Sequence, residues 1–209
     1  MAQSRIILVR HAQSLHHVDQ LAPGHPDEAN GLTDIGRQQA CALARRLKAD
    51  LGDDACLLFT SNLRRSLETA QIIAQGLGVE PTASAELREV WNRPVSAAAR
   101  AARDAAAQEF SLFDWRPCEG EETWRQFHAR VSEYVDDLIV RADRLPIIVT
   151  HGGTLSTIVT WWLGLPLDVL PERDPFRSSP GSLTVLSTNR FGHRVLACLN
   201  DTAHLLRQR

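Results

Sequence analysis

Arginine and histidine side chains follow apolar segments of the sequence, in residue types that suit phosphate chemistry. Arg10 and His11 come directly after one apolar run, His151 comes directly after another, and Arg64-Arg65 follows a third within a few residues. Guanidinium forks match the oxygens of a phosphoryl group, and neutral imidazole is a competent nucleophile near pH 7. The pattern therefore predicts a site that binds a phosphate and attacks it.

Three apolar runs, the first of them rich in β-branched residues, are expected to be the buried strands that position these side chains. They are residues 4–10 (SRIILVR), 55–60 (ACLLFT) and 145–150 (LPIIVT). Amphipathic helical patterns lie between them, and strands that alternate with helices are typical of α/β proteins. In such sheets, ligands bind beyond the carboxyl ends of the strands. We expect an α/β fold, a three-layer αβα sandwich with a mostly parallel central sheet and a small helical cap.

Capping signals predict where the helices begin and end. Thr33 is expected to cap one helix, and Ser61 or Asn62 to cap the next, which ends near Gly78. A further helix begins at Gly152, where free backbone amides favour an anion. The remaining patterns predict a weak strand at 81–85, a helix around 124–138, and two final strands at 182–187 and 194–199.

Length and composition indicate one globular domain. The chain has 209 residues, of which 44% are hydrophobic and 23% charged, and about 150 residues per domain is usual. We expect a single domain over 1–209 with an alanine-rich cap segment at about 91–118. The cap aromatics either line the site or pack the cap onto the body, and both alternatives stay open: they are Trp91, Phe110, Phe113 and Trp115.

Charge and residue usage exclude several classes of function. The formal net charge of −2 does not favour nucleic acid or an anionic membrane. No apolar run approaches the roughly 20 residues that span a bilayer, and no secretory signal is recognisable, so we expect a cytoplasmic protein. Lys48 is the only lysine, and the chain has neither a phosphate-binding GxxxxGK motif nor a CxxC pair. An anion site must therefore use arginine, histidine and backbone amides.

Each feature alone has an ordinary explanation. A single histidine at a strand end is more often structural, Arg64-Arg65 alone is a solvated helix turn, and Glu89 alone is a surface carboxylate. A metal site is the other interpretation of the histidines, but the spacing of the set matches no zinc pattern, and we expect no metal. That set is His11, His16, His17 and His25. The coincidence of histidines and arginines at three strand ends is what favours a site.

Motifs spread along nearly the whole chain occur in an order typical of one family. They are 8–14 (LVRHAQS), 31–36 (GLTDIG), 61–70 (SNLRRSLETA), 87–89 (LRE), 120–122 (GEE), 149–153 (VTHGG) and 200–205 (NDTAHL). The first resembles LVRHGES, the signature of the histidine phosphatase superfamily, which includes the phosphoglycerate mutases. The last resembles the NDxxHL ending of several bacterial phosphatases of that family.

The resemblance implies a role for each matching residue. His11 is the nucleophile that becomes phosphohistidine, Glu89 is the general acid, and His151 is catalytic and binds phosphate. Arg10 and Arg65 bind the phosphoryl oxygens; Arg64 is the alternative to Arg65. A carboxylic acid can protonate the leaving alkoxide and then accept a proton from the attacking water. For that double role, we expect the pKa of Glu89 to be raised.

Two departures from the family pattern bear on the site. Ala12 stands where the family has glycine, and its methyl group could crowd the phosphate. His17 stands where many members have an asparagine that holds the phosphate or the substrate. His17 either binds phosphate through a ring N–H or faces solvent, and both alternatives stay open.

The resulting hypothesis is a metal-independent phosphomonoester hydrolase that acts on a small phosphorylated metabolite and needs no cofactor. The chain lacks the longer, more basic segments of the cofactor-dependent mutases, which favours hydrolysis. The alternatives are a phosphoglycerate mutase-type phosphotransferase and a catalytically weak module that binds a phosphorylated ligand. A homodimer stays open, because Trp161-Trp162 belongs either to the core or to an interface.

Overall fold

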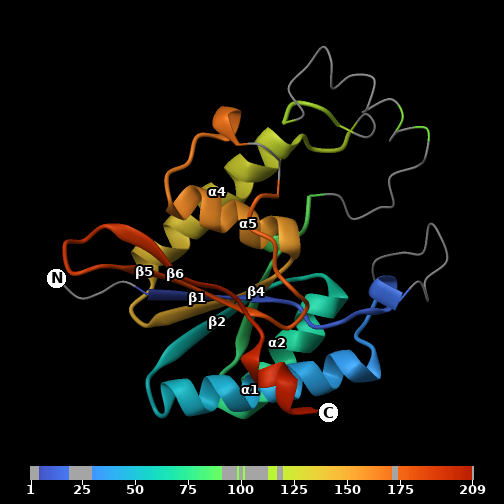
Figure 1. The fold of residues 1–209 in the computed structure, drawn as a ribbon, viewed down its shortest axis with the longest axis vertical. Coiled ribbons are helices and arrows are strands. Elements are labelled where there is room, and N and C mark those ends of the chain that lie inside the picture. Colours follow the sequence, from blue (N-terminus) through green and yellow to red (C-terminus); the bar gives the residue numbers. More distant parts are fainter. Residues whose placement is uncertain are drawn as a thin grey trace.

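A six-stranded sheet forms the centre of the chain, with the strand order β3-β2-β4-β1-β5-β6 (Figure 1). A computed structural model describes residues 5–18, 30–90, 98, 101, 113–116, 120–170 and 174–208. Strands β3, β2, β4 and β1 run parallel, and β5 and β6 are antiparallel to their neighbours. The strands are β1 (Arg5–Arg10), β2 (Cys56–Ser61), β3 (Pro81–Ser84), β4 (Leu145–Thr150), β5 (Leu183–Thr188) and β6 (Arg194–Asp201).

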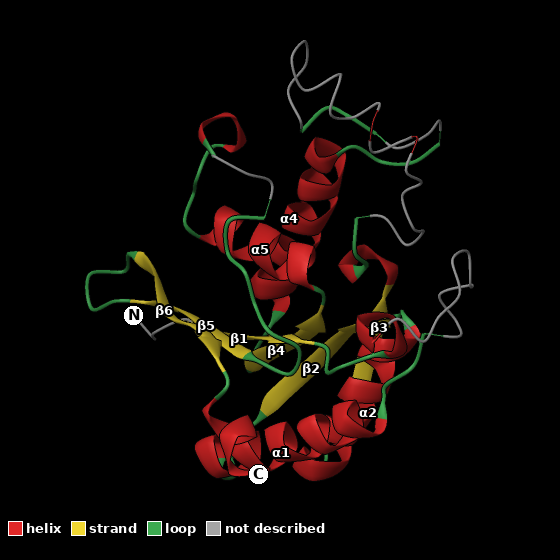
Figure 2. Cartoon of the chain, turned by 45° about the vertical axis from the view of Figure 1, so that its right-hand side comes forward, coloured by secondary structure: helices red, strands yellow, loops and turns green. Residues whose placement is uncertain are grey.

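Helices cover both faces of this sheet, which confirms the expected αβα layers. Helices α1 and α2 lie on one face, and α4 and α5 on the other (Figure 2). The α-helices are α1 (Asp34–Leu51), α2 (Arg64–Leu77), α4 (Trp124–Arg141) and α5 (Gly152–Trp162). Short 3-10 helices complete the structure: η1 (Leu15–Val18), η3 (Ala85–Leu87), η4 (Leu167–Val169) and η5 (Ala203–Gln208).

The alternation of side chains along β1 explains why the sheet carries two cores. Ile7 and Val9 pack with residues of α1 and α2, such as Leu47 and Ile73. Ile6 and Leu8 point to the other face and join a cluster that includes Phe127 of α4 and Ile158 of α5. Successive strand residues face opposite sides, so a strand buried on both faces is apolar throughout. The apolar run at 4–10 therefore marks a central strand.

The capping predictions are confirmed at two helix ends and wrong at one. Thr33 caps α1 by accepting a hydrogen bond from the Gly36 amide, and Gly78 ends α2 in the left-handed conformation. Helix α2, however, begins after Leu63, which has no side-chain cap. Ser61, one predicted cap, is the last residue of β2, and Asn62, the other, follows that strand. The Ser61 hydroxyl contacts His151 and the Asn62 side chain accepts from Arg88, so these side chains bind residues across the sheet edge and do not cap α2.

The predicted cap segment lies mostly outside the described residues, as do Trp91 and Phe110. Phe113 is buried in the core cluster on the α4 and α5 side of the sheet, and Trp162 is also buried there with 2% exposure. Trp161 is partly buried against the same cluster, and the Arg194 guanidinium lies over both rings. Trp162 therefore belongs to the core, and Trp161 packs against it from a partly exposed position. Within the described ranges, no helix is both long and apolar enough to cross a bilayer.

Candidate active site

Three neighbouring strands end at one edge of the sheet and bring the predicted site residues together. Strand β1 lies beside β4 in parallel register, and the His11 amide donates to the Thr150 carbonyl at 2.8 Å. The His11 and His151 rings, which directly follow these strands, have centroids 5.1 Å apart. Ser61 at the end of β2 contacts His151. The site therefore lies at the carboxyl edge, as the sequence predicted.

The hydrogen bonds of His11 define which ring nitrogen can attack. Nδ1 lies 2.8 Å from the Ala12 carbonyl, which only accepts, so Nδ1 carries the hydrogen. Nε2 then keeps its lone pair, and it accepts from Nε of Arg65 at 3.2 Å. Burial, followed by the charges of His151 and Arg65, lowers the pKa of His11 well below its usual value. The ring is thus a neutral imidazole whose Nε2 carries a lone pair.

His151 has a buried ring nitrogen, Nδ1, that has no hydrogen-bond partner among the described residues. Its Nε2 lies 2.8 Å from the Ser61 hydroxyl. That hydroxyl also accepts from the Leu63 amide, and it can donate its own hydrogen to Nε2. In the tautomer in which it does so, the hydrogen of the neutral ring is on Nδ1, which is buried and without a hydrogen-bond partner in the described part of the chain. A buried donor of this kind is suited to an anionic ligand.

Arg10 and His17 bring two further donors face to face. The Ser14 amide donates to Nδ1 of His17, so the neutral His17 ring carries its hydrogen on Nε2. That Nε2 lies 3.3 Å from Nη2 of Arg10. Burial is the main cause that lowers the pKa of His17 to about 4, so the ring is neutral at pH 7. Two donors this close can share one oxygen acceptor, which favours the phosphate-binding alternative for His17.

Helix α2 separates the roles of its two arginines. Arg65 is buried in the first turn and reaches His11, whereas the Arg64 side chain is 54% exposed and pairs with Glu68 at 2.7 Å. Arg65 is therefore the site arginine. Gly152 begins α5 next to the site, and a Cβ there would lie 3.4 Å from Cζ of Arg10. The partial positive charge of a helix N-terminus adds to these cations.

Glu89 is a buried carboxyl group held by backbone amides. Its Oε2 accepts from the Gly153 amide at 2.9 Å, and its Oε1 accepts from the Val90 amide at 3.0 Å. Burial raises the pKa of Glu89 above its usual value, although these amides oppose the shift. A Cβ on Gly153 would lie only 2.5 Å from Oε1 of Glu89, so glycine is required for this approach.

The Ala12 methyl group packs into a small apolar cluster with Leu32 and Ala40. Its amide donates to the Thr69 hydroxyl at 3.2 Å. The residue is fully buried, and its side chain belongs to the packing beneath the site. The expected crowding of the phosphate by this methyl group therefore finds no support in the packing.

Sequence reasoning missed Ser61 as a contributor to the site, although its position at a strand end is the same signal that identified His11 and His151. A further contributor is the chain around Ser178, whose carbonyl accepts from Nη1 of Arg10. The turn signal of Pro180-Gly181 predicts a loop there, and the contact joins residues 168 positions apart.

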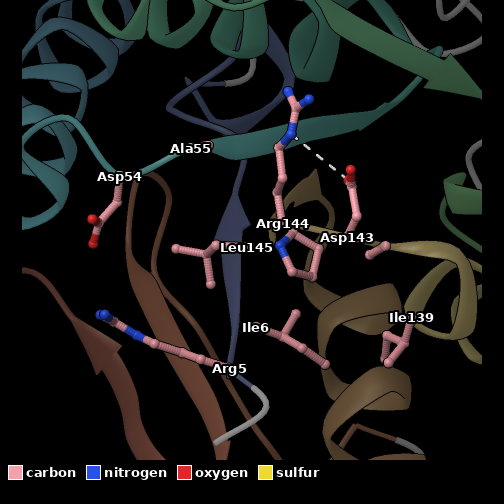
Figure 3. A pocket seen from close by; sticks show the side chains of 10 residues that line it. Arg5, Ile6, Asp54, Ala55, Ile139, Asp143, Arg144 and Leu145 are labelled. Carbon is pink, nitrogen blue, oxygen red and sulfur yellow. Dashed lines mark ion pairs between the residues drawn. The ribbon is translucent and has the colours of Figure 1, made fainter. Parts of the chain in front are cut away.

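Other features of the described residues do not compete with this site. No group of three His, Cys, Asp or Glu residues is arranged to hold a metal ion in the ranges that the structure describes. A cavity of about 520 Å³ lies at the opposite, amino edge of the sheet, where β1 and β4 begin (Figure 3). Its lining includes Arg5, Asp54, Asp143 and Arg144, with Ile6 and Leu145, and no histidine.

The histidine and arginine side chains at the carboxyl edge of this α/β sheet are suited to binding a phosphoryl group, and comparison with known proteins supports a phosphoric monoester hydrolase. The family model "Histidine phosphatase superfamily (branch 1)" matches residues 6–202, so the chain belongs to that family. This confirms the resemblance that the motifs indicated.

Individual proteins similar to this chain carry the names of phosphatases and of a phosphoglycerate mutase. Glucosyl-3-phosphoglycerate phosphatase of Mycolicibacterium vanbaalenii is 30% identical over 186 residues, which cover 82% of this chain and 79% of that protein. "Probable phosphoglycerate mutase GpmB" of Yersinia pestis is 29% identical over 171 residues, 78% of this chain and 76% of its own. The structure of a mycobacterial glucosyl-3-phosphoglycerate phosphatase with VO3 superimposes with a TM-score of 0.73 at 25% identity. It covers 95% of this chain and 100% of its own.

Proposed function

We propose that this chain hydrolyses the phosphomonoester of a small phosphorylated metabolite through a covalent phosphohistidine on Nε2 of His11, without a metal ion. The observation that carries the proposal is the convergence of donors around that nitrogen. Nε–H of Arg10 is buried and has no acceptor among the described residues, and Nδ1 of His151, which is the donor nitrogen when Ser61 donates to Nε2, is likewise buried and without a partner there. A phosphoryl group beside His11 would supply the oxygens that these donors lack.

In the proposed site, several side chains and one backbone amide bind the negatively charged oxygens of the phosphoryl group. Arg10 and Arg65 supply two guanidinium groups, and neutral His17 and His151 supply ring N–H donors. The amide of Gly152 adds the N-terminus of α5. Charge in phosphoryl transfer is spread over the equatorial oxygens, so positioned donors are the main requirement for catalysis. Two guanidinium groups supply the positive charge that a metal ion supplies in other phosphatases.

The first step transfers the phosphoryl group to the enzyme. The Nε2 lone pair of His11 attacks phosphorus, and the bond from phosphorus to the leaving oxygen breaks. The leaving oxygen takes the proton of the Glu89 carboxyl group, so the alcohol departs neutral. The Ala12 carbonyl holds the Nδ1 hydrogen and so orients the ring for this attack.

The second step returns the enzyme to its starting state. The Glu89 carboxylate accepts a proton from water, and the water oxygen forms its bond to phosphorus as the bond to Nε2 breaks. Inorganic phosphate leaves, Nε2 regains its lone pair and Glu89 is again protonated. Transfer to a second substrate in place of water would give the mutase reaction.

The test is hydrolysis of a generic aryl phosphate across pH 4–9 in the presence of EDTA. The enzymes compared are wild type, His11→Ala and His193→Ala, the last a matched control because His193 is exposed on the β5–β6 hairpin. We expect EDTA-resistant turnover in wild type and His193→Ala and none in His11→Ala. Turnover that His11→Ala retains would overturn the proposal.

Two further readouts separate the alternatives. A mutase would need a bisphosphate primer and would transfer phosphate between phosphoglycerates faster than it releases inorganic phosphate. A binding module would show phosphate affinity with no turnover in any variant. Quenching in base, where phosphohistidine survives, should trap a phosphorylated wild-type protein and leave His11→Ala unmodified.

A further inference from the structure

We propose that Asn200 and His204, at the end of the chain, are positioning residues that hold the catalytic Arg10 and His11 from behind. They act through the turn at residues 178–182 and need not touch the substrate. This inference rests on the proposed function of the site. It assigns a role to the 200–205 motif, which the proposed reaction leaves unused.

The 178–182 turn contacts the site residues through its backbone. The Gly181 amide donates to the carbonyls of Arg10 and His11 at 3.1 and 3.2 Å, and the Arg10 amide donates to the Ser182 carbonyl at 3.2 Å. The Ser178 carbonyl accepts from Nη1 of Arg10. The turn therefore determines where the Arg10 guanidinium points and where the His11 backbone lies.

The end of the chain holds this turn at two points. Oδ1 of Asn200 accepts from the Ser179 amide at 2.6 Å. Nε2 of His204 lies 2.9 Å from the Gly181 carbonyl, which only accepts, so Nε2 is the donor. The turn thus has the site on one side and the Asn200 and His204 side chains on the other. Loss of either hydrogen bond would shift the turn and, with it, Arg10.

The backbone of Asn200 is shaped for this contact. Its φ of 56° is the one positive value at a non-glycine residue among the described residues. Asparagine tolerates this left-handed conformation better than most residues do. The Asn200 amide donates to the Thr184 hydroxyl at 3.2 Å, which places the residue against β5. An uncommon conformation at a residue whose side chain holds a site turn points to function.

The motif is itself attached to the rigid part of the fold. Asp201 accepts from the Ala203 amide at 2.9 Å and pairs with Arg46 of α1 at 3.4 Å. Figure 1 shows the end of the chain beside α1. Because the motif is fixed to α1, it can restrain the turn and is not simply carried along by it.

The experiment removes each contact and restores it. His204→Leu deletes the donor, while His204→Gln keeps an N–H near the position of Nε2. Asn200→Gly keeps the backbone conformation without the side chain, while Asn200→Asp keeps the acceptor oxygen. Thr202→Ala is the control, because no Thr202 side-chain hydrogen bond is found in the described part of the chain. The readouts are kcat/KM for an aryl phosphate, calorimetric affinity for inorganic phosphate, and thermal unfolding.

We expect His204→Leu and Asn200→Gly to lose roughly 10- to 100-fold in kcat/KM, because small displacements of catalytic groups are costly. Phosphate affinity should fall with it, while the folded fraction at assay temperature stays unchanged. His204→Gln and Asn200→Asp should recover most of the loss, and Thr202→Ala should match wild type. The double variant His204→Leu/Asn200→Gly should lose less than the product of the single losses, because both act through one turn.

The inference would be overturned if His204→Leu and Asn200→Gly both kept the wild-type kcat/KM and the wild-type phosphate affinity. Losses that follow only the unfolded fraction, or losses that His204→Gln and Asn200→Asp fail to reduce, would overturn it as well. Failure of the proposed function looks different, because wild type itself would then lack turnover. In that case the calorimetric phosphate affinity of the same variants would still decide whether the motif positions Arg10.

Discussion

Burial shifts the pKa values of His11 and Glu89, the proposed nucleophile and acid, in opposite directions. It lowers the pKa of His11 well below the usual value and raises that of Glu89. Burial penalises the charged form, which is the cation for imidazole and the anion for a carboxyl group. Both shifts favour the neutral forms, and these are the forms that the first chemical step needs. The downward shift at His11 and the upward shift at Glu89 therefore both extend the pH range in which the two groups are neutral.

The pH dependence of kcat/KM should report this pair. We expect activity to persist below pH 6.5, because His11 stays neutral there, and to fall as pH rises through the raised pKa of Glu89. In Glu89→Gln the alkaline fall should disappear along with most of the activity. The loss should be larger for an alkyl phosphate than for an aryl phosphate, whose leaving group needs less protonation. If kcat/KM of Glu89→Gln fell at alkaline pH as it does in wild type, that fall would belong to the titration of another group.

At the scale of elements, the first turn of α1 and the loop after β1 are in direct contact. A Cβ on Gly36 would lie 2.0 Å from the Gln13 carbonyl oxygen, a backbone atom that cannot move alone. Gln13 follows His11 by two residues, and its amide is held by the Gln39 side chain of α1 at 2.9 Å. Contacts with α1 therefore set the position of the loop that carries His11.

Gly36→Ala should consequently be destabilising, although alanine favours helix. We expect a loss of roughly 1–3 kcal/mol, as for overpacked sites, against a gain of about 1 kcal/mol in helix propensity. Because the loop carries His11, kcat should also fall. The neighbouring Ile35→Ala is the control, since Ile35 is 55% exposed, and its stability should change by about 0.5 kcal/mol or less. Denaturant unfolding measures both, and equal stabilities would contradict this contact.

Elements with strong local signals could be predicted from sequence, and contacts across the fold could not. The run at 145–150 and the caps at Thr33 and Gly78 depend on neighbouring residues, and all three are confirmed. The expectation for Ser61 and Asn62 was wrong because His151 and Arg88, distant in sequence, bind their side chains. The strand-end pattern located His11, Arg65 and His151, but the choice between Arg64 and Arg65 needed burial.

At the scale of the whole molecule, phosphate binding should be linked to stability. A ligand that binds the folded state raises its stability by RT ln(1 + [L]/Kd). We expect inorganic phosphate to raise Tm in wild type and less in His17→Ala, whose phosphate affinity should fall roughly tenfold. One hydrogen bond to a charged group is worth about 1.5 kcal/mol. His17→Asn should retain more of the shift. Differential scanning fluorimetry measures it, and equal shifts in wild type and His17→Ala would place His17 outside the site.

The place of β1 within the sheet has a consequence for how the protein is made. Ile7 pairs with Ile147 on one side and with Val185 on the other, so β1 is bordered by two strands that are synthesised much later than β1 itself. Its four buried residues stay without these sheet partners until the chain has been synthesised through β5. Pairings that distant in sequence close slowly, and the intervening period exposes an apolar strand. Assembly of the candidate site thus waits for the synthesis of β4 and β5, and chains released before that carry His11 without a sheet to hold it.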